Sequence, residues 1–443
     1  MRTLTTGLAL GILSTVALAV PAEASRTAGN AKTADAAQTA DPAPTNVKVA
    51  WLDAGHTKFR LSWNEVGTVP NLLQWQYSDQ NITYTAAAGD PNHLDVTAAG
   101  AIEEPSVRLA VYVATPAGEP TSPAGFSARF DTLRTPRPVI DQISQVSPTR
   151  FKVKWHPVAA TDPNPGDPLD VPPGTPQYQV LANQSWLNSY QPVTTASTAT
   201  EATFEQRTAP PFKVSVTGTT EWGDSYAPSR GIGYERIASL TIPSAATYGQ
   251  LTVIRGLVNR IEQTCDPGPC WEQLTKEQPR TVVLQARTNA TSPWYVVGST
   301  RTAANGAFSI SPPTRGTRQY RVVVPDVFDA LGLGLGIASG PATTSAKPRV
   351  SASFADPTAT YGQRVTARVA IAPPANVRTT LQRWDGKAWR DLKWVNTTNG
   401  SGSYTFAATQ RGRYAYRFLV PAFTYAGRSL TWQVSPSIVL TTR

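Results

Sequence analysis

Apolar and polar residues alternate in many short runs of this chain, a pattern that predicts β-strands. Two clear runs are Phe59–Trp63 (Phe-Arg-Leu-Ser-Trp) and Phe151–Trp155 (Phe-Lys-Val-Lys-Trp). Because successive side chains of a strand point to opposite faces, each run has one face for a core and one for solvent. Turn-forming Pro and Gly separate the runs, and Ala, Leu, Glu and Lys at helical spacing are scarce. We therefore expect an almost entirely β protein.

A set of short motifs occurs twice, in the same order, in the second half of the chain. The first copy holds Tyr248-Gly249-Gln250, Leu284-Gln285, Trp294, Gly306-Ala307-Phe308 and Tyr320-Arg321. The second copy holds Tyr361-Gly362-Gln363, Leu381-Gln382, Trp389, Gly402-Ser403-Tyr404 and Tyr416-Arg417. The Gly and Tyr-Arg motifs recur after 96 residues, which predicts tandem domains rather than a short solenoid period. We expect the repeated Trp to anchor each core.

The first copy is longer than the second, because its Tyr-Gly-Gln motif lies 113 residues before the next one. The extra residues hold both cysteines of the chain, Cys265 and Cys270, around a turn sequence. In an exported protein, two cysteines so close together favour a disulfide at the tip of a hairpin. The alternative is a metal site, but two thiolates supply only half of a tetrahedral shell and no His is near in sequence.

The first half of the mature chain also consists of two similar units. Each has an early Trp at the end of its second strand, Trp63 or Trp155, and a long penultimate strand, Ser106–Ala114 or Phe212–Thr217. A small-Gly-acid turn follows the first of these strands, and Glu221-Trp222-Gly223-Asp224 follows the second. Both units resemble fibronectin type III domains, which implies β-sandwiches of two antiparallel sheets.

The two Tyr-Gly-Gln units resemble the immunoglobulin-like repeats of secreted actinobacterial proteins. Together the resemblances imply an all-β fold of four tandem immunoglobulin- and fibronectin-like β-sandwiches, after a signal peptide and a disordered leader. The expected segments are a signal peptide (1–24), a leader (25–43), two fibronectin type III-like domains (44–134 and 135–237), an immunoglobulin-like repeat with a disulfide hairpin (238–346) and a basic immunoglobulin-like repeat (347–443).

The start of the chain has the features of a signal peptide. A basic residue follows Met1, an apolar run covers Leu8–Val20, and Ala22-Glu23-Ala24 offers a cleavage site. The following Ala-, Thr- and Asp-rich stretch lacks any periodic apolar pattern and is typical of a spacer. Since no later apolar run is long enough to span a bilayer, we expect a secreted protein, retained at a cell surface only by non-covalent contacts.

The positive charge of the chain is concentrated in its last domain. Residues 347–443 hold 14 Lys and Arg against 3 Asp, a net charge of +11, whereas the whole chain carries +10. Localised positive charge attracts polyanions such as wall polymers, acidic polysaccharides, phospholipid head groups or extracellular DNA. The candidate contacts are Arg383, Lys387, Arg390, Lys393, Arg411 and Arg413.

Neighbouring Arg383 and Trp384 point to opposite faces of a strand, so we expect buried indoles behind displayed guanidinium groups. The alternative is that these charges only solvate the sandwich surface.

The sequence offers little to catalysis. Three His in 443 residues form no metal-binding pair, and no nucleophile elbow occurs. The candidate acid pairs, Glu103 with Glu104 and Glu262 with Glu272, are weak because adjacent strand residues face opposite ways and paired surface acids are common. The Gly-Leu repeat Gly332–Gly336 neither opens a helix nor follows a parallel strand, so we expect a flexible loop or an edge strand.

We therefore predict a non-enzymatic binding or adhesion protein with no cofactor, no metal site and no specific nucleic-acid binding. Its expected partner is a cell-envelope or extracellular anionic polymer, contacted through the basic last domain. One alternative is a carbohydrate-binding accessory protein that stacks sugars on Trp186 and Trp222. A glycoside hydrolase with unrecognised carboxylates and a purely structural spacer are the others. The ligand, the angles between domains and the oligomeric state stay open at this point.

Overall fold

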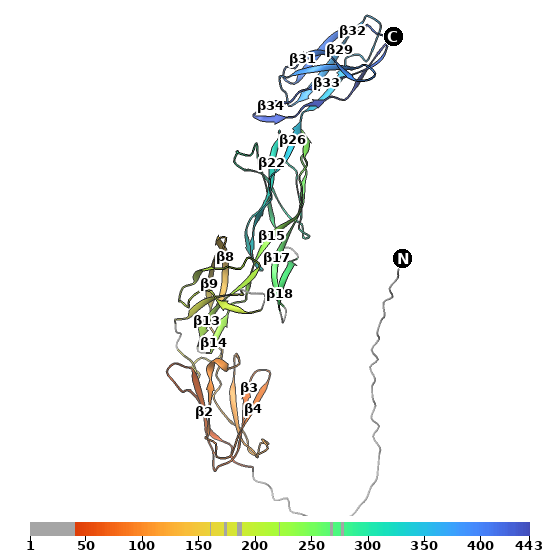
Figure 1. The fold of residues 1–443 in the computed structure, drawn as a ribbon. Coiled ribbons are helices and arrows are strands. Elements are labelled where there is room, and N and C mark those ends of the chain that lie inside the picture. Colours follow the sequence, from red (N-terminus) through yellow and green to blue (C-terminus); the bar gives the residue numbers. More distant parts are fainter. Residues whose placement is uncertain are drawn as a thin grey trace, which may run out of the picture.

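The computed structural model describes residues 40–443, apart from residues 160, 172–174, 184–187, 221, 266–268 and 276–278. The predicted signal peptide and nearly all of the predicted leader lie outside the described residues. The described chain forms four β-sandwiches in a row (Figure 1), each around its own cluster of buried apolar side chains. One short 3-10 helix, η1 (Ala98–Gly100), is the only helix in this part of the chain, so the all-β prediction is confirmed. No described helix has the length and apolar character to cross a membrane.

The first sandwich has the strand order of a fibronectin type III domain. One sheet has the order β1-β2-β5 and the other β4-β3-β6-β7. Alternation along β2 places Phe59, Leu61 and Trp63 in the core, as the sequence pattern predicts. The strands are β1 (Thr45–Trp51), β2 (Lys58–Asn64), β3 (Asn71–Gln76), β4 (Asn81–Ala86), β5 (His93–Thr97), β6 (Arg108–Val113) and β7 (Gly125–Phe126).

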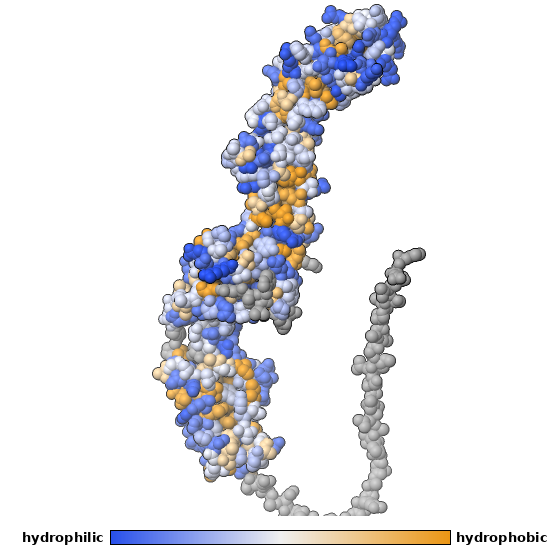
Figure 2. Space-filling view, in the orientation of Figure 1, coloured by the Kyte–Doolittle hydropathy of each residue, from blue (hydrophilic) through white to orange (hydrophobic). Residues whose placement is uncertain are grey.

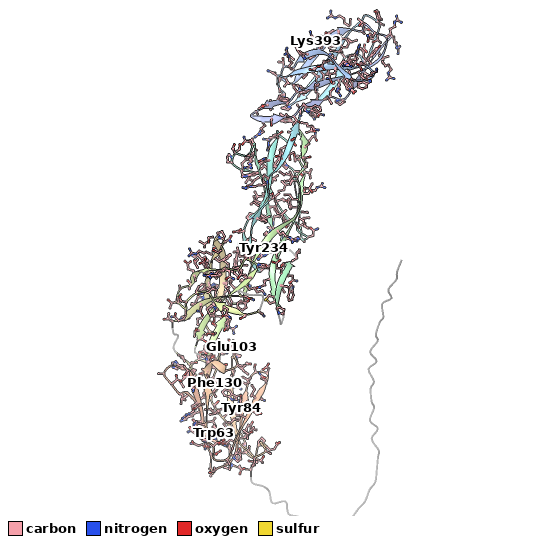
Figure 3. All side chains as sticks on the ribbon, in the orientation of Figure 1. Trp63, Tyr84, Glu103, Phe130, Tyr234 and Lys393 are labelled. Atoms are coloured by element: carbon pink, nitrogen blue, oxygen red, sulfur yellow. A yellow bond between two sulfur atoms is a disulfide. The ribbon has the colours of Figure 1, made fainter. Side chains whose placement is uncertain are left out.

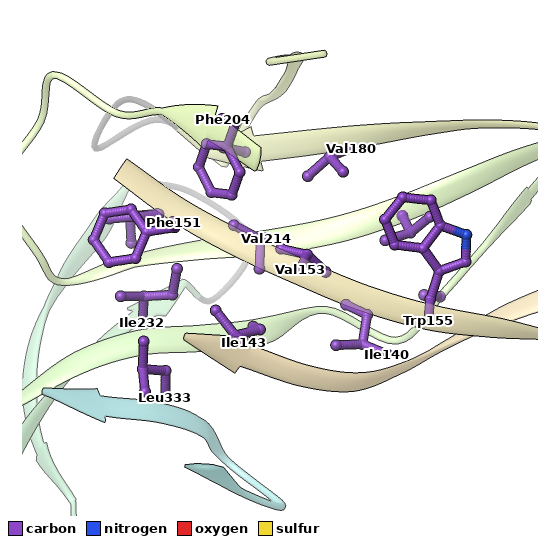
Figure 4. Packing of buried hydrophobic residues seen from close by; sticks show 14 of the residues in the cluster. Ile140, Ile143, Phe151, Val153, Trp155, Val180, Phe204, Val214, Ile232 and Leu333 are labelled. Carbon is purple, nitrogen blue, oxygen red and sulfur yellow. The ribbon is translucent and has the colours of Figure 1, made fainter. Parts of the chain in front are cut away.

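The second sandwich repeats this order, with sheets β12-β9-β8 and β11-β10-β13-β15. Its core packs Phe151, Val153 and Trp155 of β9 against Val180 and Val214 of the facing sheet (Figure 4). The strands are β8 (Arg137–Ser147), β9 (Arg150–Val158), β10 (Gln177–Asn183), β11 (Tyr190–Pro192), β12 (Glu201–Glu205), β13 (Phe212–Thr220), β14 (Gly223–Tyr226) and β15 (Arg230–Thr241).

The third sandwich differs from the first two because its short β16 pairs in parallel with β26. One sheet has the order β16-β26-β22-β19-β20, and β17 pairs with β21 and the end of β15 in the facing layer. The strands are β16 (Ala245–Thr247), β17 (Ile254–Cys265), β18 (Cys270–Thr275), β19 (Thr281–Arg287), β20 (Tyr295–Arg301), β21 (Ala307–Ile310), β22 (Arg318–Val324), β23 (Val327–Asp329), β24 (Gly332–Leu335), β25 (Ile337–Ala338) and β26 (Ala342–Lys347).

The fourth sandwich has the same plan, which the repeated sequence motifs predict. Its β28 pairs in parallel with β37, and its sheets are β27-β29-β32 and β28-β37-β33-β30-β31. The strands are β27 (Arg349–Phe354), β28 (Thr358–Ala359), β29 (Arg364–Ala372), β30 (Arg378–Trp384), β31 (Trp389–Asn396), β32 (Ser401–Ala407), β33 (Gly412–Val420), β34 (Phe423–Tyr425), β35 (Arg428–Leu430), β36 (Gln433–Val434) and β37 (Ile438–Thr442).

The second and third sandwiches share a sheet. The strand β15 pairs with β13 of the second sandwich and then with β17 of the third, so it runs through the predicted boundary at residues 237 and 238. In return, β24 pairs in parallel with β15 and places Leu333 beside Ile232 in the second core (Figure 4). The expectation of a flexible loop or edge strand at Gly332–Gly336 is therefore wrong: β24 lies between β15 and β23, and its first three residues are buried.

A buried ion network lies at this shared sheet. Arg280 pairs with Glu235 at 3.1 Å and with Asp329 at 2.6 Å, and Arg260 pairs with Asp329 at 3.3 Å and with Glu262 at 2.7 Å. Both arginine side chains are almost inaccessible to water. Burial alone raises the pKa of Asp329, but the hydrogen bond from Arg280 and the charge of Arg260 outweigh it and lower that pKa. The network therefore links residues of both sandwiches.

The predicted disulfide between Cys265 and Cys270 is confirmed, and it closes the β17–β18 hairpin. The side-chain amide of Asn183, at the end of β10 in the second sandwich, lies 3.5 Å from Cys270 Sγ and 3.8 Å from Cys265 Sγ. The extra residues of the first repeat thus form a hairpin that reaches back to the preceding sandwich.

A hairpin also connects the third and fourth sandwiches. The strands β34 and β35 project from the last sandwich, where Ser429 O accepts a hydrogen bond from Thr317 N at 2.9 Å. A Cβ atom on Gly316 would lie 2.4 Å from Arg428 Cβ, so only glycine fits this close approach. Side-chain contacts therefore connect the second sandwich to the third, and main-chain contacts connect the third to the fourth.

Candidate polyanion-binding surface

The six candidate basic residues lie on or next to the sheet β31-β30-β33 of the last sandwich. All of them are exposed except Arg383, which is half-buried. Arg383 and Arg390 are opposite each other in the register of β30 and β31, so the structure brings these two together. Figure 3 shows Lys393 at the opposite end of the rod from Trp63, and Figure 2 shows that hydrophilic residues cover most of the visible face of this sandwich.

Asp385 is neutralised by Arg390. Arg390 Nε lies 2.7 Å from Asp385 Oδ2, and the backbone N–H groups of Ala388 and Lys387 also donate to this carboxylate. These hydrogen bonds, the one from Arg390 first, hold the pKa of Asp385 well below its usual range. Asp391 accepts a hydrogen bond from Gln382 at 2.8 Å. The three carboxylates of this domain therefore leave most of its positive charge uncompensated.

The tryptophans of this sheet lie on its outer face. The Arg378 guanidinium stacks on Trp394 at 4.4 Å, and that of Arg417 stacks on Trp389 at 4.3 Å. Trp384 packs against Trp389 with ring centroids 5.6 Å apart. The exposed fraction is 62% for Trp394 and 38% for Trp384. The expectation of buried indoles behind displayed guanidinium groups is therefore wrong, because the rings share the solvent-facing surface with Arg378 and Arg417.

The same arrangement occurs in the preceding repeat. Arg287 and Arg321 both stack on Trp294, at 4.5 Å and 4.4 Å, and Arg321 Nε donates to Gln285 Oε1 at 2.8 Å. In the last sandwich, Arg417 Nε donates to Gln382 Oε1 at the same distance. The Leu-Gln, Trp and Tyr-Arg motifs thus encode one outer-face stack in each repeat. Trp294 and Trp389 belong to no core cluster, whereas Trp63 and Trp155 belong to the cores of the first two sandwiches. The core-anchor expectation is therefore wrong for the two later repeats only.

Arg383 faces the opposite side of the same sheet. Its register partner on β33 is Tyr416, a core residue, and the side chains of directly opposite residues share a face. It lines a pocket of about 210 Å³ between the two sheets, together with Tyr404, Tyr414 and Gln410. Sequence reasoning selected Arg383 for its charge, and only the pairing of β30 with β33 shows that its side chain faces the core side of the sheet.

The two candidate aromatic contacts have different outcomes. Trp186 lies outside the described residues. Trp222 is 3% exposed and belongs to the core of the first sandwich, where it packs against Trp51 and Phe59 with ring centroids 5.2 Å and 5.8 Å away. Trp51 Nε1 also donates to Leu169 O of the second sandwich at 2.9 Å. Trp222 is therefore not presented to a ligand, and it fixes the first junction of the rod.

An acidic cluster lies at the first junction. Carboxylate oxygens of Asp131, Asp167 and Asp170 all lie within 4.8 Å of one another. Within the part of the chain that the structure describes, this cluster has the geometry to hold a cation. Burial, with the charges of Asp170 and Asp131 as lesser causes, raises the pKa of Asp167 to about 6. Backbone N–H groups of Leu133, Leu169 and Gly166 donate to these carboxylates. Sequence reasoning missed this cluster, because its members come from two sandwiches.

The candidate acid pairs take part in ion pairs and hydrogen bonds. Glu103 contacts the Arg137 guanidinium, and Glu104 accepts from Ser78 at 2.8 Å. Glu262 pairs with buried Arg260. Burial raises the pKa of Glu103, but hydrogen bonds from the Arg134 N–H and the Arg137 guanidinium outweigh it and lower that pKa, whereas a general acid needs a raised one.

No protein-family model matches this chain, and no curated protein matches it either. Several solved structures are similar to parts or most of it. A tetra-tandem repeat from the extending region of a large adhesion protein is 12% identical, over 89% of this chain and 98% of its own, with a TM-score of 0.23. The FN1–FN3 domains of chicken CNTN1 are 10% identical over 69% of this chain and 98% of their own, with a TM-score of 0.18.

Three titin immunoglobulin domains, in an E-to-A mutated variant, are 10% identical over 70% of this chain and 99% of their own, with a TM-score of 0.27. Identities and TM-scores this low carry no argument about function. The assignment of tandem immunoglobulin- and fibronectin-like sandwiches rests on the strand pairing described above.

Proposed function

We propose that this protein is an exported, non-catalytic binding protein, a rod of β-sandwiches that holds its basic last domain against an anionic polymer of the cell envelope or the extracellular space. The observation that carries the proposal is the concentration of charge. Residues 347–443 carry a net +11, so the remaining sandwiches together are close to neutral. Such a domain creates a local field that attracts polyanions, while the rest of the rod does not compete for them.

The contacts between sandwiches support the rod in this role. Trp222 enters the first core, Leu333 enters the second, and the β34–β35 hairpin contacts the third sandwich. Interfaces built from buried side chains restrict the motion of one domain relative to the next. The basic domain is therefore held at a distance from the start of the rod.

The export of the protein is supported by two features. The signal-peptide pattern in residues 1–24 predicts secretion, and the Cys265–Cys270 disulfide is typical of an oxidising compartment. The resemblance to secreted actinobacterial repeats agrees with both.

The test is retention of the mature protein on isolated cell walls, teichoic acid, polygalacturonate and a neutral polysaccharide across a salt series. We expect retention on the anionic polymers that falls steeply with salt, since exposed charges act through a screened field. A variant that lacks three exposed charges of the last domain (Lys387→Gln, Lys393→Gln, Arg413→Gln) should elute at clearly lower salt.

A matched variant controls for net charge. Lys48→Gln, Arg150→Gln and Arg207→Gln remove the same number of exposed charges from the first two sandwiches. This control should elute as the unmodified protein does. Equal losses in both variants, or no retention of the unmodified protein at low salt, would contradict the proposal.

A further inference from the structure

The last sandwich contains a pocket whose lining suits a small anionic group. The pocket opens between β32 of one sheet and β30 and β33 of the other, and its volume is about 210 Å³. The aromatic rings of Tyr404, Phe406 and Tyr414 form much of its wall. Tyr404 and Phe406 stack with centroids 5.9 Å apart and planes 17° from parallel, so they present a continuous apolar surface.

Arg383 is the one charged side chain in this lining, and no carboxylate belongs to it. Its Nη1 donates to Gln410 Oε1 at 2.6 Å, and its guanidinium lies 5.3 Å from the Tyr414 ring. The guanidinium also interacts with the Tyr416 hydroxyl. A guanidinium has five N–H donors, so donors remain after the contacts with Gln410 and Tyr416. These contacts hold the group in place at the pocket, where it can pair with a planar carboxylate or a phosphate.

The preceding repeat shows that this pocket is not a general property of the fold. The Leu-Gln motifs align Arg383 with Ala286, and the Tyr-Arg motifs align Tyr414 with Arg318 and Phe406 with Ile310. Those three residues of the third sandwich are all less than one-tenth exposed. These positions of the third sandwich are therefore closed to solvent, and of the two repeats, over their described residues, only the last sandwich combines an accessible arginine with open aromatic walls.

We infer that this pocket binds one anionic sugar or polyol unit of the polymer, with Arg383 as the contact to its carboxylate or phosphate. The inference rests on the proposed function and gives it a specific site. Aromatic walls can pack against the apolar face of a sugar ring, and a few well-placed polar groups then fix its orientation. The volume admits a single unit, so recognition at this site is local, unlike the diffuse attraction of the whole domain.

Binding of the full mature chain to polygalacturonate and to polyglycerol-phosphate teichoic acid tests the inference and separates the two sources of negative charge. We expect Arg383→Gln to weaken binding of the preferred polymer by about tenfold or more, since hydrogen bonds to a charged partner are lost. The matched control is Arg378→Gln, which removes the same charge from the same strand but on the outer face. It should weaken binding by less than about threefold.

A second measurement uses small probes on the unmodified protein. Galacturonate or glycerol phosphate should bind saturably and compete with the polymer, whereas galactose and glycerol should not. Arg383→Lys keeps the charge but loses the planar fork, so it should still bind less tightly than the unmodified protein. It also provides a test if Arg383→Gln does not fold.

Three outcomes would overturn the inference, and only one of them would also overturn the proposed function. Equal losses for Arg383→Gln and Arg378→Gln would show that only the overall charge matters, which overturns the pocket but not the proposed function. Polymer binding without any saturable binding of the small anions would do the same. No binding of either polymer by the unmodified protein would overturn both.

Discussion

Trp222 of the second sandwich packs against Trp51 of the first, with their ring centroids 5.2 Å apart. Trp222 is 3% exposed and contributes to the first core although it belongs to the turn between β13 and β14. A residue that resembles an exposed ligand contact in the sequence is thus part of a junction. The folding of the first sandwich is therefore coupled to the presence of the second.

Replacement of Trp222 should destabilise the first sandwich. We expect Trp222→Ala to lower its free energy of unfolding by about 3–5 kcal/mol, because a large buried ring leaves a cavity. Urea unfolding followed by tryptophan fluorescence and by limited proteolysis would measure the loss. Trp394→Ala is the control, since Trp394 is exposed and its contact with Arg378 contributes about 1 kcal/mol or less. Similar losses in the two variants would contradict the packing role.

The buried ion network predicts that replacement of Arg280 strongly lowers the free energy of unfolding. Arg280→Leu leaves the carboxylates of Glu235 and Asp329 without this partner, and breaking a buried ion pair costs about 3–5 kcal/mol. In thermal unfolding of the full chain, the second and third sandwiches should melt in one transition, and the variant should lower its midpoint. Arg390→Leu breaks an exposed pair with Asp385, which water and salt screen, so it should leave this transition nearly unchanged. Separate transitions of the two sandwiches would argue against a shared unit.

The acidic cluster at the first junction predicts that the stability of the folded protein depends on pH. The pKa of Asp167 is about 6 in the folded state, whereas an unfolded Asp titrates near about 3.9. The folded state therefore binds more protons between these values, so stability falls as pH rises from about 4 to about 6 and then levels off.

Asp131→Asn tests this dependence. The variant removes one negative charge beside Asp167 and keeps an acceptor for the backbone N–H of Leu133. The loss of melting temperature between pH 4.5 and pH 7 should be smaller than in the unmodified protein. Asp79→Asn, which removes an exposed carboxylate elsewhere in the first sandwich, should leave the loss unchanged. An equal effect of both variants would show that the cluster does not cause the pH dependence of the melting temperature.

Loss of the disulfide should have a moderate effect. The bond closes a loop with a sequence separation of 5, for which chain entropy gives about 2 kcal/mol. The double variant Cys265→Ser, Cys270→Ser should therefore lower the free energy of unfolding of the second and third sandwiches by about that amount. Hydrogen exchange should increase in β17, β18 and around Asn183, because the hairpin reaches the second sandwich. An increase confined to the hairpin would contradict that contact.

Much of the fold followed from local patterns. The alternation along Phe59–Trp63 and Phe151–Trp155 predicted which side chains are buried, because the two-residue period of a strand ties sequence directly to the faces of a sheet. The repeated motifs predicted two sandwiches of one plan, and the spacing of Cys265 and Cys270 predicted their bond. The location of the excess positive charge was likewise a property of the sequence alone.

The tertiary structure decided which face each functional side chain occupies. Trp389 lies outside under Arg417, while Arg383 lies at a pocket, since the pairing of β30 with β31 and β33 sets these positions. It also decided that Leu333 and Trp222 complete the cores of neighbouring sandwiches. Periodicity records only whether a side chain is on one face or the other. Which partner covers that face depends on contacts between residues far apart in the chain, and no local pattern encodes them.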